Sequence, residues 1–203
     1  YNEVIGDRPV VGICGSAIPD AVAALLDAGI LSSDGRICTE ESLSDGWSGD
    51  LRDRITTDGR HRAFVLAHAG DSADRTPVLL TQRDVREIQM ASGAIRTGIE
   101  LLLRRAGLVA SQIAEVILAG GFGSVLARDR VRRIGMLPPE VPSDRIHVVG
   151  NSALEGAVIR AGRPESAGEV RQIARRVTIV DLSTDPGFQR TFTDFMRFPV
   201  PED

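Results

Sequence analysis

The segment that is most informative about the fold class is Ile117-Leu118-Ala119-Gly120-Gly121-Phe122-Gly123. A mostly apolar segment of strand length, residues 115–119, runs directly into a turn that holds three glycines. Open α/β sheets bind ligands at the carboxyl ends of their strands, and glycine lets the backbone approach a ligand closely because it has no Cβ. The stretch therefore predicts either a turn that contacts a ligand or a tight strand-to-helix turn that binds nothing. Its glycine spacing does not match the dinucleotide fingerprint.

The segments after this turn alternate between helix and strand signals. Their patterns predict a helix over 128–134, a strand over 145–149, helices over 153–161 and 164–176, a strand over 177–182, and a last helix with Pro186 at its first position. Strand–helix alternation from 77 to 182 is typical of an α/β sheet with parallel strand pairs.

The segments before the turn add one long helix. Thr81 and Asp84 form a capping box, which predicts a helix from about 82 to 106 that Gly107 closes. Upstream, Ser16 is expected to cap a helix whose first turn holds Pro19 and whose periodic part covers 21–28. We also expect a loop-rich excursion over 32–62 with little regular structure, and an antiparallel pair of strands at 63–67 and 77–80. The long helix carries one apolar stripe at helical spacing: Val85, Ile88, Ser92, Ile95, Ile99, Leu102 and Ala106.

Composition excludes several classes of protein. The chain has 203 residues, of which 42% are hydrophobic and 26% charged, so it is a globular chain rather than a disordered or coiled-coil one. All 24 basic residues are Arg, so neither a phosphate-binding loop with its lysine nor a Schiff-base lysine is present. The net charge of −4 without a long basic run disfavours nucleic-acid binding. No apolar stretch approaches the roughly 18 residues of a membrane-spanning helix, so we expect no membrane partner.

The first residue and the number of cysteines lead us to expect a cytoplasmic fragment of a larger protein. Cys14 and Cys38 are too few for a disulfide framework, and their spacing matches no metal signature, so a reducing, cytoplasmic setting is expected. The chain opens at Tyr1 without Met or a signal peptide, as a fragment or a processed product would.

A second stripe on the long helix is polar. Gln82, Arg86, Gln89, Gly93 and Arg96 recur at spacings of four and three. A glycine inside a helix costs about 1 kcal/mol, so its presence suggests that something packs closely there. The stripe is either the wall of a cleft that holds a purine and ribose, or a solvated face whose glycine packs on a neighbouring strand.

A third candidate begins at Asn151, where a predicted strand ends and a helix starts. The unpaired N–H groups of a helix start can bind an anion, and the small residues up to Ala157 allow another helix to approach. The alternative is a plain capped helix packed through Ala and Gly.

Six segments in this order closely resemble the C-terminal part of the reductive activators of corrinoid proteins, over about residues 9–200. They are Gly12-Ile13-Cys14-Gly15-Ser16, Thr81-Gln82-Arg83-Asp84-Val85-Arg86, Ala119-Gly120-Gly121-Phe122-Gly123, Ile134-Gly135-Met136-Leu137-Pro138, Gly150-Asn151-Ser152-Ala153-Leu154 and Leu182-Ser183-Thr184-Asp185-Pro186.

The resemblance implies a ribonuclease H-like lobe of the actin-like ATPase and sugar-kinase superfamily, with a mixed sheet, flanking helices and an incomplete N-terminus. Residues 1–203 would form a single C-terminal portion of that ATPase domain. Such activators use ATP, with Mg, to drive one electron onto the Co(II) corrinoid of a methyltransferase system, which becomes Co(I). Their 2Fe–2S cluster sits in an upstream domain that this chain lacks, so we expect the chain alone to be inactive.

The resemblance also implies site residues and a partner. Gly120, Gly121, Phe122 and Gly123 would line the nucleotide, Gln82, Arg86 and Gln89 would face the cleft, and Asn151 would open the helix at which two lobes hinge. The partner would be a corrinoid protein, and a homodimer stays open. Two other functions also stay open: a docking module for the corrinoid protein with a decayed nucleotide site, and a relative of the sugar kinases that phosphorylates a small molecule.

Overall fold

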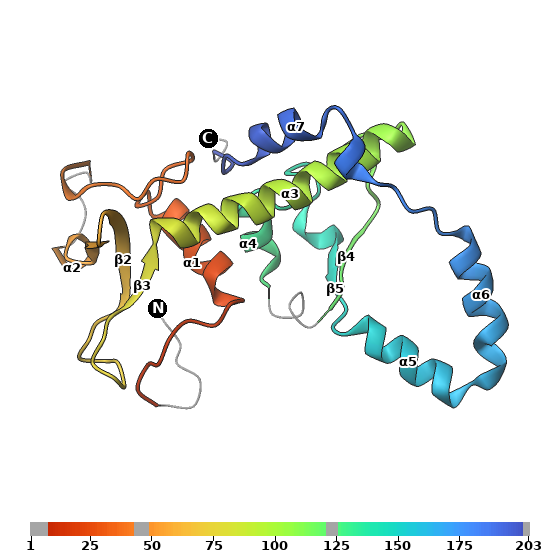
Figure 1. Cartoon of the computed structure of the whole chain (residues 1–203), viewed down its shortest axis with the longest axis horizontal. Coiled ribbons are helices and arrows are strands. Elements are labelled where there is room, and N and C mark those ends of the chain that lie inside the picture. Colours follow the sequence, from red (N-terminus) through yellow and green to blue (C-terminus); the bar gives the residue numbers. More distant parts are fainter. Residues whose placement is uncertain (1–7, 43–48, 121–125, 201–203) are drawn as a thin grey trace.

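The computed structural model describes residues 8–42, 49–120 and 126–200. Figure 1 shows one long helix, α3 (Gln82–Ala106), that runs across the molecule, with two small sheets and the other helices arranged around it. The expected α/β class is confirmed, and the strands are divided between a three-stranded and a two-stranded sheet.

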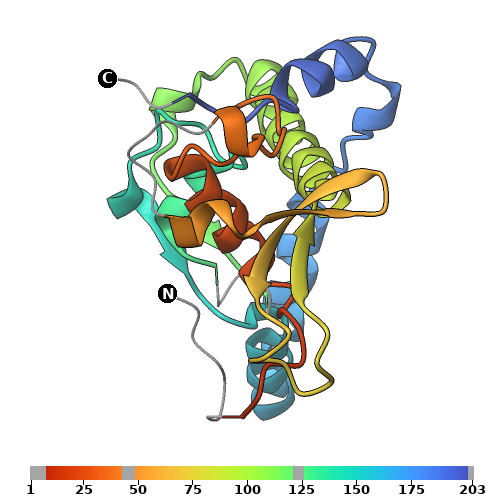
Figure 2. The same cartoon turned by 90° about the vertical axis from the view of Figure 1, so that its left-hand side faces the viewer.

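The first sheet is antiparallel in the order β1-β2-β3, with strands β1 (Ile55–Asp58), β2 (His61–Ala67) and β3 (Val78–Thr81). Figure 2 views the molecule from the end that carries this sheet. The expected pair of strands is confirmed by the register Phe64↔Leu80. The expectation for 32–62 is wrong in part, because β1 and the short helix α2 (Gly49–Arg52) lie within it.

The long helix has the predicted bounds. The Thr81 side chain accepts a hydrogen bond from the Asp84 N–H, and the Asp84 carboxylate accepts one from the Thr81 N–H at 2.8 Å. Gly107 ends the helix at a φ of 69°. The apolar stripe is only partly a core face. Val85 and Ser92 are buried, but Ile95 and Leu102 are each 46% exposed.

The second sheet is the parallel pair β4 (Val116–Leu118) and β5 (Ile146–Val148), as the strand–helix alternation predicted. The helix α4 (Arg128–Arg133) lies between them in the chain, where a helix was expected. Helix α1 (Ala17–Asp27) begins directly after Ser16, the expected cap, although the Ser16 side chain makes no cap hydrogen bond. Gly29 follows the helix at a φ of 70°.

Two helices extend away from the rest of the molecule: α5 (Ser152–Gly162) and α6 (Ala167–Arg176), joined by a short 3₁₀ turn at Pro164–Ser166 (Figure 1). We call residues 152–176 the arm. Residues 177–181 then lead back as an extended segment to α7 (Phe188–Phe195), which lies along α3.

Two predictions near the C-terminus are wrong. Residues 177–182 do not form a strand, because in the described chain they find no partner strand. The last helix begins at Phe188 rather than at Pro186, and Asp185 instead binds the Gly187 N–H at 2.8 Å.

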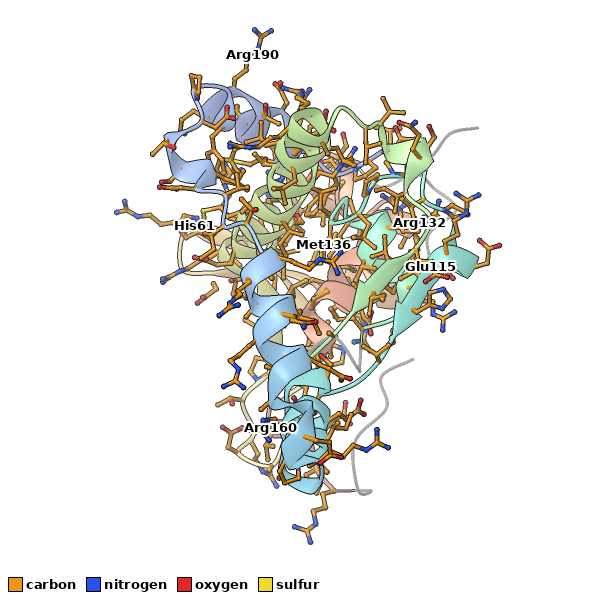
Figure 3. The ribbon with its side chains drawn as sticks, turned by 90° about the vertical axis from the view of Figure 1, so that its right-hand side faces the viewer. His61, Glu115, Arg132, Met136, Arg160 and Arg190 are labelled. Carbon is orange, nitrogen blue, oxygen red and sulfur yellow. The ribbon has the colours of Figure 1, made fainter. Side chains whose placement is uncertain are left out.

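Two buried clusters form the core. One joins α1, β2, β3 and the start of α3, and its largest fully buried side chains include Ile30, Leu80 and Ile134. The other surrounds Ile146 of β5. Met136 packs against both clusters, and Figure 3 shows it inside the body while Arg160 lies on the arm. The body therefore has a continuous interior in which the arm takes no part.

Candidate functional site

The turns after β4 and β5 lie side by side at the carboxyl ends of the parallel strands. The Gly120 N–H donates to the Gly150 carbonyl at 2.6 Å, and the Val149 N–H donates to the Leu118 carbonyl at 3.0 Å. Both glycines have the left-handed φ that favours glycine, 107° at Gly120 and 65° at Gly150. A Cβ on either would meet no atom within 4 Å, so the space beside both turns is open in the described chain. Gly121, Phe122 and Gly123 lie outside the described residues.

Asn151 follows at once and begins α5. Its side-chain oxygen accepts a hydrogen bond from the Leu154 N–H at 3.1 Å, so the predicted cap is confirmed. The Ser152 N–H also donates, to the Gly150 carbonyl at 3.1 Å. The helix dipole still favours negative charge near this end.

Replacing Asn151 with Ala removes about 1 kcal/mol of local helix stability. Because α5 buries none of its residues, the loss appears as fraying of the helix rather than as unfolding of the chain. Amide exchange at Leu154 is expected to accelerate roughly fivefold. Ser152→Ala is the control, since no cap bond depends on it; equal acceleration in both variants would contradict the capping role.

Gln82 is engaged inside the protein. Its Oε1 accepts the Ile37 N–H at 3.1 Å, and its Nε2 donates to the Gly35 carbonyl. These two bonds tie the first turn of α3 to the loop that follows α1. Both polar atoms of the Gln82 side chain are thus hydrogen-bonded to backbone groups.

Gln89 is buried, and its Nε2 donates to the Met196 carbonyl at 2.9 Å. Arg86 is exposed and donates from Nη1 to the Gln89 Oε1 at 3.1 Å. Of the three side chains expected to face a cleft, Arg86 alone lies at the surface. No hydrogen bond between described residues joins any of the three to Gly120 or Asn151.

The same polar stripe continues under α7. A Cβ on Gly93 would come within 3.2 Å of the Phe195 carbonyl oxygen, and the Arg96 guanidinium lies 4.7 Å from the centre of the Phe195 ring. The stripe is therefore neither a free cleft wall nor a solvated face, because the C-terminal helix covers this part of it. The expected close packing at Gly93 is confirmed, and its partner was not foreseen.

Arg96 is the most buried charge on this stripe, with a side chain that is 8% exposed. Its Nη2 lies 4.0 Å from carboxylate oxygens of Glu100 and Glu140. Burial lowers the pKa of the Arg96 guanidinium, and the two carboxylates oppose that shift. An arginine is still charged at neutral pH after such a shift, so Arg96 serves as a fixed cation between α3 and the C-terminal segment.

Two cavities lie away from these turns. One of about 230 Å³ borders Arg96, Leu137 and Phe195, and another of about 330 Å³ borders Thr39, Ile55 and Arg62. Neither lining includes Gly120 or Asn151. Among the residues that the structure describes, no group of three His, Cys, Asp or Glu side chains could hold a metal ion. In the described part of the chain, every helix falls short of the length and apolarity that crossing a membrane requires.

Comparison with known proteins shows which family the chain belongs to. A family model described as the C-terminal domain of RACo, the ASKHA domain, matches residues 1–203. The corrinoid activation enzyme RamQ of Eubacterium limosum is 33% identical over 191 residues, which cover 94% of this chain and 32% of that protein. The Co(II) methylated amine-specific corrinoid protein reductase of Methanosarcina barkeri is 24% identical over 230 residues, covering 94% of this chain and 42% of that protein.

A solved structure agrees with the sequence matches. The reductive activator for a corrinoid, iron–sulfur protein superposes with a TM-score of 0.84 at 32% identity, over 97% of this chain and 30% of that one. The chain thus spans about a third of the length of RamQ and of this solved structure. The fold expected from the resemblance is confirmed, and the chain belongs to the family of the C-terminal, ASKHA domain of RACo.

Proposed function

We propose that this chain is the C-terminal nucleotide-lobe portion of an ATP-dependent reductive activator, which returns the Co(II) corrinoid of a methyltransferase system to Co(I). One observation carries the proposal: the chain aligns over nearly its whole length with a solved reductive activator at a TM-score of 0.84. As part of the same proposal, the partner is a corrinoid protein and the setting is the cytoplasm, where the free Cys14 and Cys38 stay reduced.

ATP with Mg is proposed to bind at the carboxyl ends of β4 and β5. The open space beside Gly120 and Gly150 supports this position, because a ligand can approach both backbones. The start of α5 adds the positive end of a helix dipole for the phosphates. Gly121, Phe122 and Gly123 belong to the proposed set through the sequence.

The polar stripe of α3 contributes less directly to the proposed nucleotide site. Arg86 is at the surface, and it would give up its side-chain hydrogen bond to the Gln89 Oε1 to turn towards an anion. Gln82 and Gln89 must first give up the backbone partners at Gly35, Ile37 and Met196. We therefore rank Arg86 first among the three as a nucleotide contact.

The residues present do not fit an iron–sulfur cluster. Such clusters are held by four cysteines, and this chain has two, 24 positions apart. Electron transfer is therefore assigned to polypeptide outside these residues. Within the proposal, the present chain contributes binding energy: a ligand that prefers one arrangement of two lobes shifts them towards it, and that energy offsets an unfavourable reduction.

One observation favours docking without ATP as a second function. Two of the three side chains expected at the nucleotide, Gln82 and Gln89, are already bonded within the chain. A docking module would keep its affinity for the corrinoid protein whether or not ATP is present.

The test uses the full-length activator with its corrinoid protein and a low-potential reductant, and follows Co(II) and Co(I) by their absorption. ATP is expected to be required, and Gly120→Val is expected to reduce activation at least tenfold, because its φ of 107° suits glycine alone. Gly59→Val is the matched control, since Gly59 is also a turn glycine, with a φ of 61° and open space, but lies between β1 and β2.

Three results would count against ATP use. These are reduction that proceeds equally without ATP, a Gly120→Val variant as active as the parent protein, and calorimetry that detects no ATP binding by the parent. Retained affinity for the corrinoid protein together with any of them would favour the docking function.

A further inference from the structure

The arm buries no side chain of either of its helices. α5 has 11 residues and α6 has 10. Helices of this length are marginal in water unless a face is packed, because few backbone bonds follow the costly first turn. The arm as the structure shows it therefore lacks the contact that a stable pair of helices requires.

The arm has an apolar face ready for such a contact. Val170 and Ile173 are three residues apart, so they share one side of α6, and they are 49% and 64% exposed. Val177, 64% exposed, follows directly after the helix. On α5, Leu154 and Val158 form a similar pair, 60% and 63% exposed. Aliphatic side chains grouped in this way on one surface mark an interaction site.

The extended segment after α6 has the residue types of a strand but forms none in the described chain. Four β-forming residues, Val177 to Val180, stand in a row, and Ile179 is 91% exposed. The backbone is extended at both ends, with φ −73° and ψ 128° at Val177 and φ −80° and ψ 101° at Asp181. In the described chain no other strand pairs with it. Unpaired backbone groups of this kind are a template for adding a further strand.

We propose that the arm and residues 177–181 together form a docking surface for polypeptide of the same protein that lies outside these 203 residues. The chain aligns with about a third of its curated relative and of the solved activator, so each of those proteins has roughly two further thirds from which such a contact can come. The proposed partner surface has an apolar centre and a free strand edge. The inference rests on the proposed function, which makes this chain part of a longer activator.

The charge of the arm indicates that the partner surface has an acidic rim, and it argues against a second copy of this chain as the partner. The arm carries five Arg and three Glu, although the whole chain has a net charge of −4. An acidic rim therefore complements it. Two arms packed on each other across a two-fold axis would instead bring the same arginine-rich surfaces together.

Trypsin provides the test, because the arm arginines at 160, 171, 175 and 176 are cleavage sites, whereas Arg163 is protected by the proline that follows it. The full-length protein and the 203-residue chain are digested side by side, and the cuts are located by mass. We expect the arm to be cut at least roughly tenfold more slowly in the full-length protein, since docking suppresses local unfolding.

Matched variants locate the contact. Ile173→Asp in the full-length protein is expected to restore fast cleavage, whereas Gln172→Asp, about 100° round the helix and off the face that Val170 and Ile173 share, keeps the protection. Both positions are exposed in the 203-residue chain, so neither change should alter its folding, which circular dichroism checks.

The outcomes separate this inference from the proposed function. Equal cleavage of the arm in both proteins, or a gene product with no further polypeptide, overturns it. So does a 203-residue chain that elutes as a dimer and becomes monomeric with Ile173→Asp, because the occupant is then a second copy. ATP-dependent cobalt reduction is measured independently, so either idea can fail while the other stands.

Discussion

Gly93→Leu is expected to destabilise the folded chain by about 3 kcal/mol and to displace α7 from α3. Even a Cβ at this position would lie 3.2 Å from the Phe195 carbonyl oxygen and 3.3 Å from the Met196 nitrogen, and both are backbone atoms that cannot turn aside. The larger side chain must therefore push the C-terminal segment outward. The better helix propensity of Leu offsets at most about 1 kcal/mol of this loss. Unfolding in guanidinium chloride measures the change.

Gly98→Ala, little more than one turn further along α3, is the control. Its Cβ would lie 3.5 Å from the Leu182 Cδ1, an ordinary contact, so the helix gains up to about 1 kcal/mol instead of losing stability. If Gly93→Leu unfolds at the same denaturant concentration as the parent chain, α7 is not seated on α3 as the structure describes.

Leu80→Ala is expected to cost about 3 kcal/mol, within the range for leucines removed from a packed core. Leu80 is 1% exposed and lies in the cluster that joins β3 to α1 and the start of α3. The substitution leaves a cavity at the point where the antiparallel sheet meets the helices. Thermal and denaturant unfolding report the loss.

The neighbouring Leu79→Ala provides the comparison for Leu80. Successive residues of a strand point to opposite faces, and Leu79 is only half-buried. The same chemical change should therefore cost clearly less there. Equal losses at the two positions would show that Leu80 does not occupy the core.

Local signals predicted much of the fold. The bounds of α3 follow from Thr81 and Asp84 at one end and Gly107 at the other, because caps depend only on nearby residues. Strand β1 was missed, yet Gly59, with its φ of 61°, provided a hairpin signal directly after Asp58. That signal was available in the sequence.

Other features depend on distant partners, which local patterns do not name. Val177 to Val180 have the residue types of a strand, but a strand also needs a neighbour, and the described chain offers none. Likewise, the spacing of Gln89, Gly93 and Arg96 revealed a special face of α3. Its cover, α7, lies about a hundred residues later in the chain. The expected nucleotide contacts stay a prediction for the same reason, since a ligand leaves no trace in periodicity.

Because α3 is long, a small rotation at one end corresponds to a large displacement at the other end. With 25 residues the helix is roughly 37 Å long. Gln82 in its first turn is hydrogen-bonded to the loop after α1. Its later turns pack against α7 and lie close to Leu182, next to the segment that leads back from the arm. A tilt of about 5° at the Gln82 end moves the far end by about 3 Å, a distance comparable to the reach of one hydrogen bond. A rigid tilt that began near Gly35 would therefore displace the far end of α3 far enough to break or make contacts on the opposite side of the protein.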